Sequence, residues 1–163
     1  MSARGAGESP SDVELRLAQL GRRLPAAPNP IGAYRRGVVQ GAIGCLSGQL
    51  PLRDGKIIHP GLVGRDVTVA EAQAAARVAA LNVLAQLRVL LGSFDPLAGL
   101  LRLDGFVASA PDFTEQPAVL DAASAMLVEA LGERGMHARS AMGVTVLPMN
   151  APVELVVTFA AHP

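Results

Sequence analysis

The stretch HARSAMGVTVLPMNAPVELVVTFAA, residues 137–161, decides the fold. It is the part of the chain richest in β-branched and aromatic residues, and a segment rich in proline interrupts it at residues 148–152. Runs of such residues form strands, and proline and asparagine between two runs favour a turn. The stretch is therefore predicted to form two strands joined as a β-hairpin.

Two charged residues stand out in these apolar strands. Arg139 lies at the start of the first strand, and Glu154 lies near the start of the second. An ionisable group on a sheet that is otherwise buried needs a partner or a ligand. The alternative is that both are strand-end charges that reach solvent, and composition alone favours this alternative because most charged side chains are exposed.

A wider pattern around these two charges resembles a known family. Ala-Arg-Ser at residues 138–140, Leu-Pro at 147–148 and an apolar residue followed by Glu154 resemble the C-terminal signature of the Rid family, also called YjgF-like or endoribonuclease L-PSP. Ile-Gly-Ala-Tyr at 31–34 and Ser-Gly-Gln-Leu-Pro at 47–51 extend the resemblance to roughly residues 28–160. The resemblance implies an α+β, chorismate-mutase-like fold, with two helices over a single mixed sheet, and a homotrimer.

The length of 163 residues fits one domain with its own core. Residues 1–27 are expected to be a leader that carries a short helix and a proline-rich linker, and residues 28–163 the Rid-like domain. Within the leader, residues 1–11 are predicted to be disordered. Asp12 is predicted to cap an amphipathic helix that ends at Gly21.

The remaining elements follow from local signals. Strands are expected at residues 37–40, 42–49 and 100–110, and the Asp54-Gly55 pair predicts a hairpin turn. The capping box of Thr68 and Glu71 begins a long helix that runs to about residue 91, and a second helix is predicted at residues 116–131. Helices placed between strands in this order indicate an α+β layer of two helices over a mixed sheet.

Composition argues against several classes of protein. Fourteen basic and fourteen acidic residues balance, and only 3% of residues are aromatic, so there is no electrostatic or stacking signal for nucleic acid. The N-terminus has no apolar signal-peptide core, and no run of apolar residues reaches the length of a membrane span. With the single cysteine, Cys45, this favours a cytoplasmic location. Cys45 is expected to be a small buried hydrophobe rather than a nucleophile.

No metal site is expected, because the three histidines, His59, His137 and His162, show no ligand spacing. Arginine offers a planar fork that matches a carboxylate in two hydrogen bonds. A glutamate beside such a site can hold or deprotonate a water molecule.

The resemblance implies a reaction that these two groups can perform. In the deaminase branch of the family, an enamine or imine derived from an amino acid, such as 2-aminoacrylate, is hydrolysed to a 2-keto acid and ammonia without a metal or an organic cofactor. Carried over, Arg139 binds the substrate carboxylate, Glu154 positions the water, Tyr34 covers the substrate, and Gly48 and Ala141 line the pocket. Tyr34 has an alternative role, which is to pack its ring against the edge of the domain.

This chain departs from the deaminase pattern at two places and also carries an additional N-terminal helix. Ala141 stands where deaminases commonly have cysteine, and the loop at residues 110–119 is about two residues longer than the family's. The alternative function is therefore a non-catalytic binder or sensor of small carboxylates or keto acids at the same pocket. If the turn of the predicted hairpin centres between Met149 and Asn150, Glu154 pairs with Thr145 and lies on the order of 20 Å from Arg139. Either the chain bends sharply or different subunits supply the two residues, and we expect the latter.

Overall fold

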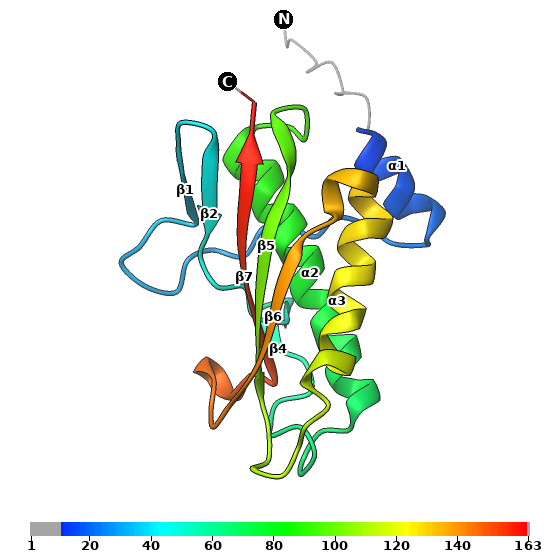
Figure 1. The fold of residues 1–163 in the computed structure, drawn as a ribbon, viewed down its shortest axis with the longest axis vertical. Coiled ribbons are helices and arrows are strands. Elements are labelled where there is room, and N and C mark those ends of the chain that lie inside the picture. The colour runs from blue at the N-terminus through cyan, green and yellow to red at the C-terminus, as the bar shows by residue number, and fades with distance from the viewer. Residues whose placement is uncertain (1–10, 163) are drawn as a thin grey trace, which may run out of the picture.

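The computed structural model describes residues 11–162, which form a five-stranded mixed sheet covered on one face by helices and a separate two-stranded sheet (Figure 1). Residues 1–10, which hold nearly all of the predicted disordered leader, and residue 163 lie outside the described part. The strands of the sheet follow the order β1-β2-β7-β5-β6. Their bounds are Gly37–Gln40 for β1, Ile43–Leu46 for β2, Leu97–Ala108 for β5, Ala138–Val144 for β6 and Val153–Ala161 for β7.

The long helix α2, Val69–Leu91, and the helix α3, Gln116–Leu131, confirm the predicted helices. Thr68 and Glu71 form the capping box, and Gly92 ends α2 with a φ of 81°. By length and composition α2 could cross a membrane, but 61% of its apolar window is buried inside the protein, as in the core helix of a soluble domain.

The short hairpin of β3, Leu52–Arg53, and β4, Lys56–Ile57, is also confirmed. Asp54 and Gly55 form its turn with φ angles of 52° and 75°, and two positive φ angles are what a tight hairpin turn requires.

The predicted hairpin of residues 137–161 is wrong. Strands β6 and β7 are not neighbours, because β5 lies between them, parallel to β6 and antiparallel to β7. A strand that follows a helical crossover joins its predecessor in parallel, and α3 is such a crossover between β5 and β6. The connection to β7, which includes the 3-10 turn η2, Pro148–Asn150, therefore crosses the end of β5. Its crossing is fixed by hydrogen bonds from Ala108 N to Pro152 O, 2.9 Å, and from Ser109 N to Val144 O, 3.0 Å.

The N-cap of the N-terminal helix α1, Asp12–Gln19, lies one residue earlier than predicted. The N-cap is Ser11 rather than Asp12, because the Ser11 hydroxyl accepts from the backbone N–H of Glu14 while the Glu14 carboxylate bonds back to Ser11. Val13 and Leu17 are fully buried in the main core. The division of the chain at residue 27 stays a prediction.

The two faces of the sheet differ. On β7 the residues at 153, 155, 157 and 159 are fully buried against the helices, and those between them lie half-buried on the other face. This open face also carries exposed apolar side chains, among them Ile43 and Met142. Cys45 is exposed on the same face, which corrects the expectation that it is buried. The alternating residues of β2 show which side chains share a face of the sheet, but the sequence of β2 does not show which of the two faces the helices cover, so it could not place Cys45.

Candidate functional site

Glu154 lies directly over Gly48. A methyl group built on Gly48 would overlap the Oε1 atom of Glu154 and would lie 2.8 Å from its carboxyl carbon. Only a residue without a side chain allows this approach. The structure therefore brings together two of the predicted site residues from distant parts of the chain.

A short bridge between Gln49 and β7 explains this placement. Gln49 N donates to Leu155 O at 2.8 Å, and Leu155 N donates to Gln49 O at 3.0 Å. Gln49 also donates through its side-chain Nε2 to Ser47 O at 2.9 Å, a bond that spans Gly48. The small-residue segment is thus fixed to β7 next to Glu154.

The Glu154 carboxylate has no hydrogen bond or ion pair with any other residue between 11 and 162. Burial disfavours the charged form, and it raises the pKa of the Glu154 carboxyl above its ordinary value. A half-buried carboxyl without a protein partner is suited to exchange a proton with water or with a ligand.

Tyr34 lies beside Gly48 around a small hollow of about 30 Å³. Its ring is about half exposed, so it does not pack into the core. Arg36 and Gln86 line the same hollow and are bonded to each other, Nη1 to Oε1, at 2.7 Å. A hollow of this size holds a few water molecules at most, so it is too small for an amino-acid derivative.

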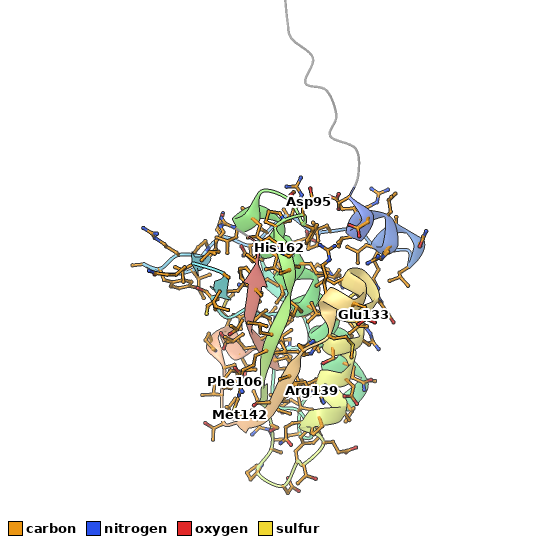
Figure 2. All side chains as sticks on the ribbon, turned by 45° about the horizontal axis from the view of Figure 1, so that its top comes forward. Asp95, Phe106, Glu133, Arg139, Met142 and His162 are labelled. Atoms are coloured by element: carbon orange, nitrogen blue, oxygen red, sulfur yellow. The ribbon has the colours of Figure 1, made fainter. Side chains whose placement is uncertain are left out.

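Arg139 lies on the other side of the sheet, against α3 (Figure 2). Its Nη1 donates to Asp121 Oδ1 at 2.9 Å and to Ser124 Oγ at 3.1 Å. Neither Nε nor Nη2 has a partner among residues 11–162, so one edge of the guanidinium stays available for a carboxylate. Ala141 follows on the same face of β6 and is partly buried against the core.

The register of the sheet separates Arg139 from Glu154. Arg139 pairs with Leu103, which pairs with Val157, and both partners are fully buried towards the helices. Glu154 pairs with Phe106, and each of the two lies between buried neighbours in its own strand, so their side chains lie on the other face of the sheet.

Two strand spacings and three residues along the strand place the Cα atoms of Arg139 and Glu154 roughly 14 Å apart. This replaces the expected 20 Å, which rested on the wrong pairing of Glu154 with Thr145. Within one chain the predicted residues thus form two sets on opposite faces: Tyr34, Gly48 and Glu154 in one, Arg139 and Ala141 in the other.

Sequence reasoning missed the residues that hold Arg139 in place. Besides Asp121 and Ser124, they include His137, whose Nδ1 lies 2.6 Å from Gly135 O and whose Nε2 lies 3.0 Å from Ser124 Oγ. In the neutral ring Nδ1 therefore donates to the carbonyl, and Nε2 accepts from the Ser124 hydroxyl. The three-residue spacing of Asp121 and Ser124 on one helix face was the available signal, but it identifies a partner only once α3 is known to pack beside β6.

Known proteins resemble this chain over most of its length. The family described as "YjgF/chorismate_mutase-like, putative endoribonuclease" matches residues 14–162. Protein TCP17 of Trypanosoma cruzi is 42% identical over 144 residues, which cover 88% of this chain and 90% of that protein.

Across residues 11–162, no group of three or more His, Cys, Asp or Glu residues could hold a metal ion.

Solved structures agree with this match. The protein Atu1372 of Agrobacterium tumefaciens, of unknown function, has a TM-score of 0.85 and 44% identity, with 92% of each chain covered. A putative endoribonuclease of Shewanella oneidensis has a TM-score of 0.87 and 34% identity, with 91% of this chain and 98% of that chain covered. Escherichia coli TdcF with bound serine has a TM-score of 0.59 and 25% identity, with 82% of this chain and 92% of that chain covered.

Proposed function

Because the chain belongs to the YjgF/chorismate-mutase-like family, we propose that it hydrolyses reactive enamines and imines derived from amino acids to 2-keto acids and ammonia in the cytoplasm. The observation that carries this proposal is the half-buried carboxyl of Glu154, which has a raised pKa, lies on Gly48 and bonds to no other residue between 11 and 162.

The proposed reaction divides the work between the two sets of residues. The free edge of Arg139 binds the substrate carboxylate and orients the C=N bond. Glu154 takes a proton from a water molecule, which adds to the imine carbon, and the same proton then passes to the nitrogen. The new hydroxyl group then gives up its proton, which also passes to the nitrogen; the C–N bond breaks as ammonia leaves, and the carbonyl of the keto acid forms. An imine carbon is already electrophilic, so two groups are sufficient.

We also propose that the site is completed between chains of a homotrimer. Arg139 and Glu154 lie on opposite faces of the sheet, and the hollow beside Tyr34 is too small for a substrate. The open face carries exposed apolar side chains, and faces of this kind commonly form protein interfaces. In a closed ring, each interface joins two different patches of the protomer, so one chain's Arg139 can meet the next chain's Glu154.

The alternative is a binder or sensor of small carboxylates that performs no reaction. Ala141, which replaces the cysteine common in deaminases, favours it, and TdcF, with its bound serine, shows that a relative can hold a small amino acid. A ribonuclease, the activity in several relatives' names, has no support in the balanced charge of this chain.

In the deciding experiment, an amino-acid oxidase generates imino acids in situ, and the rate at which they disappear is measured with and without the added protein. Acceleration that is lost in both Arg139→Ala and Glu154→Gln, but kept in Glu129→Gln, supports the proposal. Glu129 is an exposed acid on α3 and serves as the matched control. If the folded wild-type protein accelerates no imine but binds keto acids at Arg139, the binder is correct.

A further inference from the structure

A second cavity, much larger than the hollow beside Tyr34, lies under the proline-rich linker. Its volume is about 560 Å³, within the usual range for small-molecule sites. The linker, residues 23–31, forms one wall, and in Figure 1 this segment runs from α1 across α2 to β1. The hairpin of β3 and β4, the middle of α2 and Met149 form the other walls. We call it the linker cavity.

One part of the linker cavity is positively charged. Arg23 and Arg53 line it, and both are exposed. Within residues 11–162, neither guanidinium has a carboxylate within ion-pair distance. Asp54 also lines the cavity, so two cations face one anion and one positive charge remains. Guanidinium groups without partners fit a ligand carboxylate.

The inner wall offers a hydrogen-bond acceptor. Asn82 of α2 lines the linker cavity and is only 1% exposed. Its Nδ2 donates to Leu50 O at 2.9 Å and to Leu52 O at 3.0 Å, which fixes the orientation of the amide. Its Oδ1 accepts no hydrogen bond from the described residues. Every fully buried side-chain nitrogen or oxygen among these residues has a hydrogen-bond partner, so this oxygen is not fully buried. The Asn82 oxygen therefore keeps a small exposed surface, and because Asn82 lines the linker cavity, we take this surface to be the point that a ligand N–H or O–H reaches.

The remaining walls are mostly apolar, with Pro25, Val78 and Leu81 among their residues. The linker cavity therefore combines a cationic rim, a buried acceptor and apolar sides. From this combination we infer that it binds a small carboxylate that has an apolar side chain and one amide N–H, the chemistry of an N-acylated apolar amino acid. Arg139 and Glu154 do not line the linker cavity, although the cavity adjoins the hollow beside Tyr34 and shares four lining residues with it, Pro28, Asn29, Ile31 and Leu52. The inference does not rest on the proposed function.

The test uses the full chain labelled with ¹⁵N and titrated with N-acetyl-L-leucine, followed by amide chemical shifts. The expected result is saturable binding, with the largest shift changes in the linker, at Asp54 and near Asn82. Arg23→Ala and Arg53→Ala should each weaken binding by about tenfold, because each removes a charge-assisted hydrogen bond. Arg22→Ala is the matched control, since Arg22 directly precedes the linker and does not line the cavity.

Two further probes separate the chemical requirements. N-acetyl-L-leucinamide lacks the carboxylate, and 4-methylpentanoate lacks the N–H, so both should bind more weakly than N-acetyl-L-leucine. Imine hydrolysis should be unchanged in the Arg53→Ala variant. The inference is overturned if no probe binds saturably in the millimolar range, if the double variant of Arg23 and Arg53 binds like the wild type, or if the shift changes centre on Tyr34 and Gly48.

Discussion

Replacing Gly48 with alanine tests the proposed role of Glu154 without removing its carboxyl group. The new methyl group would overlap Oε1 of Glu154 and lie 2.8 Å from its carboxyl carbon, where ordinary contacts begin at 3.4 Å. The carboxyl carbon must therefore move by at least about 0.6 Å and the oxygen by more, on the order of 1 Å, a displacement that can cost about 100-fold in rate.

The same substitution should leave the fold intact. The group that must move is the end of a flexible side chain, and Gly48 has no positive φ that an alanine would strain. Alanine also reduces the freedom of the unfolded chain, so the free energy of unfolding should be unchanged or slightly higher. The matched control is Gly99→Ala in β5, where the nearest atom, Arg134 O, is at an ordinary 3.5 Å.

The assay is the oxidase-coupled loss of imino acids, run on both variants together with thermal unfolding. We expect kcat/KM to fall about 100-fold in Gly48→Ala and to stay unchanged in Gly99→Ala, with similar melting temperatures for both. If Gly48→Ala is folded and keeps wild-type activity, the precise position of Glu154 does not matter and our assignment of its role is wrong.

Three other outcomes are expected, two from the site and one from the balanced charge of the chain. Burial raises the pKa of Glu154 in the folded state, so the folded protein holds this proton more tightly than the unfolded chain, and stability falls as pH rises from about 4 through the raised pKa. Glu154→Gln should thus be at least as stable as the wild type at pH 7 in denaturant titrations and should lose this advantage below about pH 4; an advantage that grows towards low pH would contradict the sign. Asp121→Asn keeps a hydrogen-bond acceptor for Arg139 but removes a carboxylate that would lie about 6 Å from the bound substrate carboxylate, where two like charges repel by about 0.7 kcal/mol in water. KM should therefore fall about threefold in Asp121→Asn, whereas Glu129→Gln should not change KM. Labelled single-stranded RNA at physiological salt should show no saturable binding tighter than about 10⁻⁴ to 10⁻⁶ M, and specific micromolar binding would restore the ribonuclease hypothesis.

Local signals in the sequence predicted most of the elements. The capping box of Thr68 and Glu71, the Asp54-Gly55 turn and both long helices are confirmed, because each depends on residues that are neighbours in the chain. The order of the strands was not accessible in this way. The pattern of residues 137–161 indicates two strands but cannot show that β5 separates them.

The candidate site shows the same limit. The Arg139 and Glu154 pattern was visible in the sequence, but the faces to which they belong depend on the register with β5. The bonds of Asp121 and Ser124 to Arg139, and the Gln49 bridge that fixes Gly48 under Glu154, join segments far apart in the chain. A single sequence carries no signal for such long-range contacts beyond the chemistry of each residue.

The most direct test of a site shared between chains is to mix Arg139→Ala and Glu154→Gln proteins after dissociation and reassembly. In equal mixtures of the proposed trimer, three quarters of the rings contain both variants, and each mixed ring has one intact site of three. Each variant alone should be inactive, and the mixture should recover about a quarter of the wild-type imine hydrolysis. If subunit exchange is demonstrated and the mixture recovers no activity, each site lies within one chain and the shared site is refuted.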